Sequence, residues 1–203
     1  MPSAEKSEMK ERILATADKL FYLQGIRAIG VDTIAAEIGI SKRTLYNHFP
    51  SKDALIAAYL ERRFVHARPS DKPPEEQILA TFDSLERRFA AKDFRGCPFV
   101  NAVAELGPAD RAVKKIAIAF KESRRVWFRE RLNELGVSEA DALATQLVLL
   151  VDGSIAQDLV RDDPAMARAA KEAAKVLLRN AGVDMGDDTA PKPTAKRGKR
   201  PPH

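Results

Sequence analysis

Hydrophobic residues recur with the period of an α-helix along most of the chain. Near the N-terminus, one face of a helix expected at about residues 4–24 collects Ile13, Leu14, Ala17, Leu20 and Phe21. The same period predicts helices at about residues 31–38, 42–49, 51–64, 75–92, 98–106, 108–134, 138–161 and 164–181. Glycine and proline separate these segments, and no stretch alternates strictly enough to predict a strand. The pattern therefore predicts an all-α fold of about nine helices.

The composition is typical of a soluble protein of one or two domains. Of its 203 residues, 45% are hydrophobic and 31% are charged, which is enough apolar material for a packed core and excludes wholesale disorder. Apolar runs such as Leu147 to Val151 are far shorter than the roughly 20 residues that span a bilayer, and the charged N-terminus does not resemble a signal peptide. The single cysteine excludes a disulfide framework or a zinc site of several thiolates. We expect a cytoplasmic protein without a metal or cofactor.

The net charge of +5 is concentrated at the two ends of the chain. Residues 1–65 carry +2, residues 66–185 are neutral and residues 186–203 carry +3. This partition predicts two domains, 1–65 and 66–185, joined by a proline-rich linker at 68–74 and followed by a basic tail. The tail holds no apolar residue larger than alanine, so we expect disorder there. It either tracks DNA phosphates or serves as a solubilising end.

Residues 31–49 have the pattern of a helix-turn-helix. Two short helices flank Gly39, which suits the turn between them. On the second helix, Leu45 and Phe49 face inward at 100° per residue. The opposite face of that helix is therefore free to contact another molecule.

The outward face of that helix carries groups that recognise nucleic acid. Arg43 and Asn47 point nearly opposite to the core, and Thr44 and Tyr46 lie at the sides. An arginine matches O6 and N7 of guanine, and an asparagine matches N6 and N7 of adenine. Lys52 begins the next helix, where its ammonium and the helix-end amides suit a phosphate. The motif therefore predicts DNA binding.

The stretch from Gly30 to Leu55 resembles the DNA-binding domain of the TetR family of bacterial transcriptional regulators. The core Thr44-Leu45-Tyr46-x-His48-Phe49, followed by Ser51-Lys52, carries the resemblance. The preceding helix, which ends Phe21-x-x-x-Gly25, and a length of about 200 residues agree with it. The resemblance implies an N-terminal three-helix helix-turn-helix domain and a C-terminal helical domain that binds an effector and dimerises.

The resemblance also implies roles for individual residues. Base and nearby phosphate contacts fall to Lys42, Arg43, Thr44 and Asn47, and backbone phosphate contacts to Tyr46, His48 and Lys52. His48 has an alternative role as a core histidine. One position departs from the family, which usually opens the first helix of the motif with a Ser or Thr that caps it. Here Gly30 or Val31 stands there, and Asp32 or Thr33 is the candidate cap.

The C-terminal domain offers candidate residues for an effector chamber. They are mostly apolar residues on predicted helices: Phe82, Phe89, Phe99, Val103, Phe120, Arg124 and Trp127. The alternative for each apolar member is a plain core, which is the more common role of such residues. Arg124 shares a stripe with Phe120 and Trp127, so it either meets an anionic effector, or extends to the surface or pairs with a carboxylate such as Glu105.

The helices at 138–161 and 164–181 are candidates for a dimer interface. Their stripes of apolar and small residues contain Leu147, Leu150, Ser154, Ala170, Ala174 and Leu177. The alternative is that both helices complete the core of the monomer. The interface is favoured because a helix-turn-helix protein reads a palindrome as a two-fold dimer.

Together these features predict a homodimeric, ligand-responsive repressor released from a palindromic double-stranded DNA operator by a small molecule. Alternatives are an activator, a regulator that responds to oxidants through Cys97, and a sequence-independent DNA-binding module. An enzyme is not expected, because the sequence shows no Ser-His-Asp arrangement, metal-ligand cluster or glycine-rich phosphate loop.

Overall fold

The computed structural model describes residues 2–64, 70–107 and 110–185, and every regular element within them is an α-helix. The N-terminal part holds α1 (Pro2–Gln24), α2 (Val31–Glu37), α3 (Lys42–His48) and α4 (Lys52–Arg63). The C-terminal part holds α5 (Pro74–Phe89), α6 (Pro98–Leu106), α7 (Arg111–Glu134), α8 (Ala140–Arg161) and α9 (Ala165–Asn180). The predicted all-α fold is confirmed, with nine helices in the described part of the chain.

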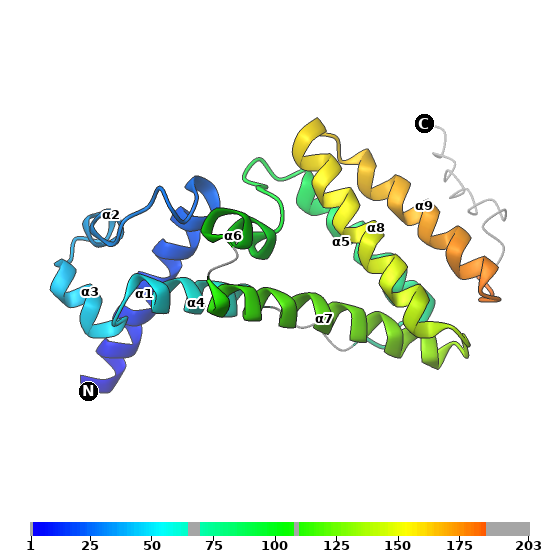
Figure 1. Ribbon diagram of the computed structural model, residues 1–203, viewed down its shortest axis with the longest axis horizontal. Coiled ribbons are helices and arrows are strands. Elements are labelled where there is room, and N and C mark those ends of the chain that lie inside the picture. The colour runs from blue at the N-terminus through cyan, green and yellow to red at the C-terminus, as the bar shows by residue number, and fades with distance from the viewer. Residues whose placement is uncertain (1, 65–69, 108–109, 186–203) are drawn as a thin grey trace, which may run out of the picture.

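The four N-terminal helices pack around one small core at one end of the molecule (Figure 1). From α1, Ile13, Ala17 and Phe21 enter this core with at most 2% of their surface exposed. Full burial of a large apolar side chain stabilises the fold by about 1.5–3 kcal/mol. Gly25 ends α1 with a φ of +95°, a backbone conformation that glycine adopts without a clash at Cβ.

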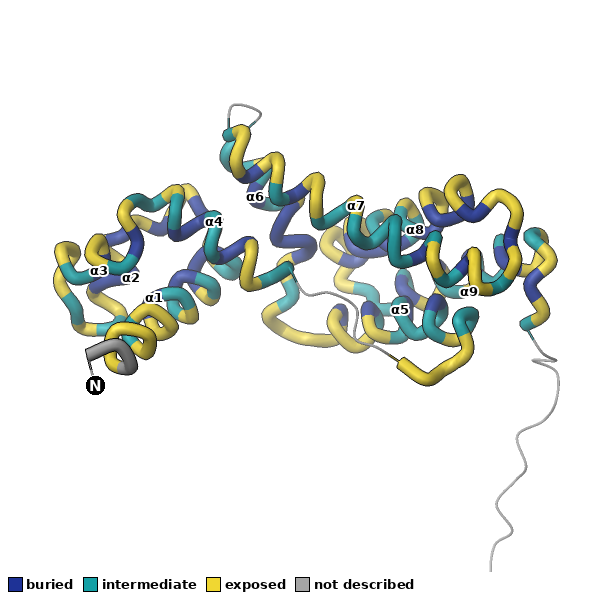
Figure 2. The backbone as a smooth tube through the Cα atoms, turned by 90° about the horizontal axis from the view of Figure 1, so that it is seen from below, coloured by how far each residue is buried: buried dark blue, intermediate teal, exposed yellow. Residues whose placement is uncertain are grey.

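Four of the C-terminal helices form a bundle. α7 packs on α8, α8 on α9, α9 on α5, and α5 returns to α7. The buried residues run along the inner sides of these helices, as Figure 2 shows. α6 lies outside the bundle, against α7 and α4.

The two parts meet where α4 reaches α7. Phe64, the C-cap of α4, lies edge-on to Phe120 in the middle of α7, with ring centroids 5.5 Å apart. Phe99 of α6 stacks on Phe120 at 3.9 Å. Apolar packing therefore continues from one domain into the other at this junction.

Several helix starts differ from the sequence prediction by one to three residues, and those of α7 and α5 have a clear physical reason. Asp110 caps α7, since its Oδ1 accepts a hydrogen bond of 3.0 Å from the amide of Val113, so the helix begins at Arg111. The predicted start at 108 lies outside the described residues. α5 begins at Pro74, inside the predicted linker, because a proline is tolerated in the first turn of a helix. Part of that linker and the whole predicted tail, 186–203, also lie outside the described residues.

Among the described helices, α8 is long and apolar enough to cross a membrane by length and composition alone. In the structure, Ala144, Leu147 and Val151 of α8 are fully buried against the other helices of the bundle. A core helix of a soluble bundle passes the same test. α8 nevertheless has exposed apolar residues on its outer face as well, among them Leu149 and Val160.

Candidate DNA-binding face and domain junction

The second helix of the helix-turn-helix is held by a cap and by two buried side chains. Ser41 Oγ accepts a hydrogen bond of 3.0 Å from the amide of Thr44, which satisfies one free amide in the first turn of α3. Leu45 and Phe49 are buried, with 0% and 4% of their surface exposed. Gly39 makes the preceding turn with a φ of +70°. These contacts fix which face of α3 points to solvent.

Two of the predicted base-reading residues lie on that outer face. Arg43 and Asn47 are exposed, and no ion pair or side-chain hydrogen bond holds either of them in the described part of the chain. Their guanidinium and amide groups are therefore available to a ligand. Lys42 is also exposed, but its Nζ lies 3.0 Å from Asp32 Oδ2 of α2, an ion pair that raises the pKa of the lysine.

Thr44 and Tyr46 lie at the sides of the same face. The hydroxyl of Thr44 lies 2.9 Å from Ser41 Oγ and is thus shared with the cap of the helix. Tyr46 keeps 39% of its surface exposed, which is unusual for a large aromatic residue and leaves its ring and hydroxyl accessible.

His48 and Lys52 lie nearer the core than the other predicted contacts. Lys52 Nζ donates a hydrogen bond of 2.7 Å to the carbonyl oxygen of Ile26 and lies over the ring of Phe21. His48 is half-buried, and within the described chain its buried Nδ1 has no hydrogen-bond partner. The other five predicted contacts thus lie on the outward side of α3, whereas His48 and Lys52 are turned toward the core of the domain.

The first helix of the motif has no side-chain cap. Gly30 occupies the N-cap position of α2, and neither Asp32 nor Thr33 caps it as expected. Both lie within the first turn of α2 rather than at its N-cap, and Asp32 pairs with Lys42 instead. The departure from the family at Gly30 therefore leaves no hydroxyl at the N-cap of α2.

The seven predicted pocket residues do not form one chamber. Phe82 and Phe89 are buried core residues, with 1% and 7% exposed, and they do not line the hollows around α7 that hold the other five. The other five are divided between hollows around α7.

One hollow lies between the two domains, and we call it the junction cavity. It has a volume of about 430 Å³. Its charged lining consists of Asp18, Arg62, Arg63, Arg88 and Arg124, and its remaining lining consists of Cys97, Pro98, Phe99, Phe120 and Ile155. Phe120, Arg124 and Trp127 also border a wider hollow of about 690 Å³ along α7.

A second hollow lies over α6, α7 and α8, and we call it the lateral groove. It has a volume of about 570 Å³ and is lined mainly by apolar atoms. Phe99 and Val103 border it together with Val100, Ile118 and Leu149, and Lys114, Lys121 and Arg125 stand at its edge. Val103 thus lies away from Arg124.

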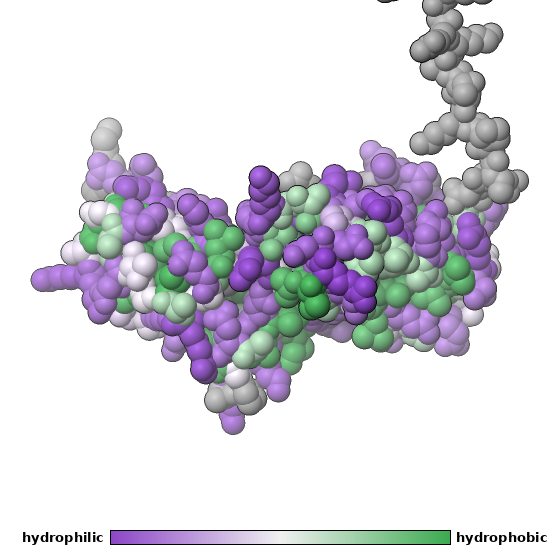
Figure 3. Space-filling model, turned by 90° about the horizontal axis from the view of Figure 1, so that it is seen from above, coloured by the Kyte–Doolittle hydropathy of each residue, from purple (hydrophilic) through white to green (hydrophobic). Residues whose placement is uncertain are grey.

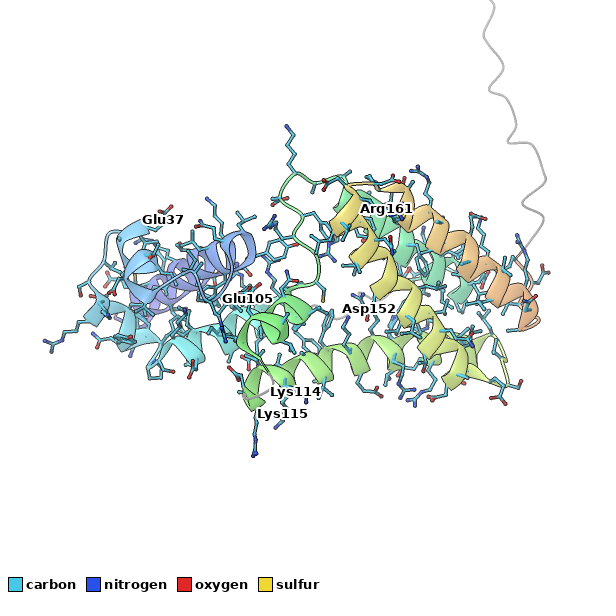
Figure 4. All side chains as sticks on the ribbon, turned by 45° about the horizontal axis from the view of Figure 1, so that its top comes forward. Glu37, Glu105, Lys114, Lys115, Asp152 and Arg161 are labelled. Carbon is cyan, nitrogen blue, oxygen red and sulfur yellow. The ribbon has the colours of Figure 1, made fainter. Side chains whose placement is uncertain are left out.

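Arg124 does not pair with Glu105, although the sequence allowed that contact. Arg124 lies over the ring of Phe120, with its guanidinium carbon 5.1 Å from the centroid. Glu105, labelled in Figure 4, instead accepts at its Oε2 a hydrogen bond of 3.0 Å from the amide of Arg27. Burial lowers the pKa of Arg124, and the nearby Arg88 lowers it further.

Two sets of hydrogen bonds hold the DNA-binding domain to the C-terminal domain. Besides the bond between Glu105 and Arg27, Tyr22 Oη donates to the carbonyl oxygen of Gly96 at 3.1 Å and accepts from the amide of Arg95 at 2.9 Å. These partners lie more than 70 residues apart in the chain. Sequence reasoning missed these links, and Arg88 as well, because no local pattern marks them.

Four of the six predicted interface residues belong to the core of the subunit. Leu147, Ser154, Ala170 and Ala174 are buried between the helices of the bundle, and Leu150 and Leu177 are half-buried. A second subunit could reach the buried four only if the bundle opened. These four residues therefore lie in the core of the monomer, which was the alternative role that the sequence allowed.

Cys97 occupies the N-cap position of α6 and is 8% exposed. Its thiol lines the junction cavity. A response to oxidants through this residue stays a prediction.

Both halves of the chain match known regulators. A model of bacterial regulatory proteins of the tetR family matches residues 13–59, and a model of the C-terminal domain of LmrA/YxaF-like transcriptional regulators matches residues 74–173. The HTH-type transcriptional regulator LmrA of Bacillus subtilis is 28% identical over 160 residues, which cover 73% of this chain and 85% of LmrA. These relatives are regulators rather than enzymes.

Solved structures agree along nearly their whole length. A TetR-family transcriptional regulator from Streptomyces coelicolor is 33% identical with a TM-score of 0.77, and the match covers 86% of this chain and 96% of the other. A TetR regulator from Streptomyces avermitilis is 31% identical with a TM-score of 0.76, over 86% and 98% of the two chains. The protein belongs to the TetR family of DNA-binding transcriptional regulators.

Proposed function

We propose that this protein is a homodimeric repressor that leaves a palindromic operator when a small molecule binds its C-terminal domain. The junction cavity carries this proposal, because its lining comes from both domains: Asp18, Arg62 and Arg63 from the N-terminal helices, and Arg88 and Arg124 from the C-terminal ones. A ligand that binds there contacts the DNA-binding domain directly. The proposed division is 1–65 for DNA binding, 66–185 for effector binding and dimerisation, and 186–203 for the tail.

The proposed DNA contacts follow the exposure of the side chains. Arg43 and Asn47 read base edges in the major groove, and Lys42, Thr44 and Tyr46 contact bases or phosphates beside them. His48 and Lys52 contact the phosphate backbone, and Lys52 does so by leaving the carbonyl oxygen of Ile26. The ion pair between Lys42 and Asp32 is exposed, so a phosphate can replace the carboxylate at little cost.

The proposed dimer interface is the outer face of α8. Ala142, Leu149, Gly153, Ala156 and Val160 are all exposed, and at 100° per residue they fall within about 60° of one another around the helix. We call this set the α8 stripe. It contains no charge, and no atom lies within 4 Å of where a Cβ on Gly153 would stand, so another helix has room to approach closely.

Large apolar side chains are exposed in the α8 stripe and on the neighbouring helix α9. Leu149 is 65% exposed and Val160 is 82% exposed, and Val176 of α9 is 52% exposed. Figure 3 shows hydrophobic surface at the middle of the molecule and over the half that holds α8 and α9. Exposed apolar patches on a soluble protein mark interaction sites, and a two-fold dimer places two copies of α3 on successive major grooves.

The hydrogen bonds between the two domains couple ligand binding in the junction cavity to the position of the DNA-binding domain. α6 lines the junction cavity at its first turn through Pro98 and Phe99, and near its last turn Glu105 holds the amide of Arg27. A ligand that displaces α6 therefore shifts the DNA-binding domain and changes the spacing of the two α3 helices. Effector and operator then favour different conformations, which is the thermodynamic requirement for release.

The experiment starts from the operator. The purified protein is used to select binding sequences from random double-stranded DNA, and the selected site is compared with a scrambled site by fluorescence polarisation at moderate salt. We expect a palindromic site that binds at least about a thousandfold more tightly than the scrambled one. Equal affinity for the two sites would instead support a sequence-independent DNA-binding module, and release of the selected site by a bound small molecule tests the second half of the proposal.

A further inference from the structure

Two arginines of the junction cavity have no anionic partner. Arg63 is held by Asp18, with Nε 2.6 Å from Oδ1 and Nη2 2.8 Å from Oδ2, and Arg62 is paired with Glu11. Arg88 and Arg124 make no ion pair within the described chain and lie only over the rings of Phe94 and Phe120. The cavity therefore has an excess of positive charge.

The surroundings do not neutralise Arg124. The carboxylate that acts on it most strongly, Asp152, is already bound by Lys121, whose Nζ lies 2.5 Å from Oδ1 (Figure 4). A half-buried guanidinium without a counter-charge gains from an anion, since hydrogen bonds between ionised groups are about twice as strong as neutral ones. Its planar fork matches a carboxylate in particular.

The rest of the cavity wall is apolar and partly aromatic. Phe99 and Phe120 lie parallel, with an interplanar angle of 13°, and Pro98 and Ile155 stand beside them. The volume of about 430 Å³ falls in the lower part of the range for small-molecule sites. Such a wall suits a flat apolar body, while the arginines suit one charged end.

We propose that the effector is an aromatic carboxylate of about two rings, whose carboxylate is bound by Arg124 and Arg88 and whose rings lie against the apolar wall of the junction cavity. This inference rests on the proposed function, because it names the chemical class of the effector. The lateral groove, with its largely apolar lining, is the place for a neutral ligand and thus the competing site.

The carboxylate of the proposed ligand also provides a way for ligand binding to change the packing of the DNA-binding domain. Arg63 lines the same cavity, so the ligand competes with Asp18 for its guanidinium. Arg63 lies in the last turn of α4 and Asp18 lies in α1, so this ion pair holds two helices of the DNA-binding domain together. Drawing Arg63 toward the ligand loosens α4 from α1.

Calorimetric titration of the full-length protein without DNA tests the site. The probes are 2-naphthoate and its neutral analogue 2-naphthamide, which have nearly the same shape. We expect naphthoate to bind about tenfold or more tightly than naphthamide. Arg124→Gln should abolish this preference and Arg88→Gln should reduce it, whereas Arg87→Gln should keep it, because Arg87 is exposed on α5 and lines none of the hollows. Circular dichroism confirms that each variant is folded.

Several outcomes would overturn the inference. They are equal affinity for the two probes, the absence of saturable binding of naphthoate, and the same loss of affinity in Arg87→Gln as in Arg124→Gln. Binding of naphthamide that is sensitive to Ile118→Asp would move the site to the lateral groove. If naphthoate binds through Arg124 but the selected operator is not released, the proposal of ligand-released repression fails and the assignment of this site stands.

Discussion

At the scale of the residue, arginines with the same chemistry differ in function because their neighbours differ. Among residues 2–64, 70–107 and 110–185, Arg43 projects from α3 without a partner, Arg63 is fixed by Asp18, and Arg124 is half-buried against an aromatic ring without a counter-charge. The first is available to DNA, the second holds helices together and the third is available to a small anion. Charge alone predicts none of these roles.

Arg43→Ala should lower affinity for the selected operator by about tenfold or more, since a bidentate contact with guanine contributes about 1–3 kcal/mol of discrimination. Affinity for scrambled DNA should fall much less, because non-specific binding rests on phosphate contacts. Fluorescence polarisation measures both affinities, with Arg87→Ala as the matched control. Equal losses on the two DNAs would assign Arg43 to phosphate contacts only.

Asp158 gives a pH-dependent prediction. It is 3% exposed in α8, its Oδ1 has no hydrogen-bond partner within the described chain, and burial raises its pKa, with Asp162 and Asp163 adding to the effect. Because the folded state favours the protonated acid, ionisation destabilises the fold. The penalty is absent at a pH below the ordinary pKa of the group, grows as the pH rises, and is complete above the raised pKa.

Asp158→Asn should therefore have a higher unfolding free energy than the wild type at pH 7, and the difference should shrink as the pH is lowered to about 4. Urea titrations at the two pH values measure it. Asp93→Asn, an exposed residue, should change little at either pH. A gain from Asp158→Asn that does not depend on pH would contradict the assignment to the buried charge.

At the scale of the element, a few polar bonds link helices that are distant in sequence. The hydroxyl of Tyr22 in α1 makes two hydrogen bonds to the loop before α6, and Glu105 in α6 holds the chain that follows α1. A Cβ on Gly25 would lie 3.0 Å from Glu105 Oε2, so the carboxylate of Glu105 packs closely against the end of α1. The proposed coupling uses these contacts, through which we expect movement of α6 to reach the DNA-binding domain.

Tyr22→Phe removes both hydrogen bonds and leaves the packing nearly unchanged. It should lower the unfolding free energy by about 1–3 kcal/mol, since the amide of Arg95 and the carbonyl of Gly96 lose their partner. Urea unfolding followed by circular dichroism measures this loss. Tyr46→Phe is the control, because Tyr46 is exposed on α3, and it should leave stability unchanged. A wild-type stability for Tyr22→Phe would mean that water replaces the hydroxyl.

At the scale of the whole molecule, the proposed dimer depends on the polarity of α8. Its inner face completes the bundle and its outer face, the α8 stripe, is apolar and uncovered in the single chain. In the proposed dimer, this interface far from α3 places the two DNA-binding domains on one duplex, so we expect it to control operator affinity.

Leu149→Asp and Val160→Asp should convert the dimer to a monomer, because each places two carboxylates at a desolvated contact across a two-fold axis. Analytical ultracentrifugation should show the change, and operator affinity should fall by at least about tenfold. The monomer should stay folded, since both side chains are exposed in it. Ala91→Asp, in the turn after α5, is the control, and a dimer that survives both stripe variants would place the interface elsewhere.

The sequence by itself determined the helices and the DNA-binding motif. The 3.6-residue period located each helix to within a few residues, and the spacing of Leu45 and Phe49 placed Arg43 and Asn47 on the outer face. These properties depend on neighbours within one or two turns, so they can be read from local spacing.

Only the tertiary structure decided what covers each face. Leu147 and Ala174 look the same in sequence whether they pack inside one subunit or between two, and the structure buries both within the bundle. Likewise, Arg124 and Glu105 were possible partners by sequence, but Glu105 binds the amide of Arg27 and Arg124 lies over the ring of Phe120. The physical reason is that periodicity records the polarity of a face, whereas its partner is set by contacts between residues far apart in the chain.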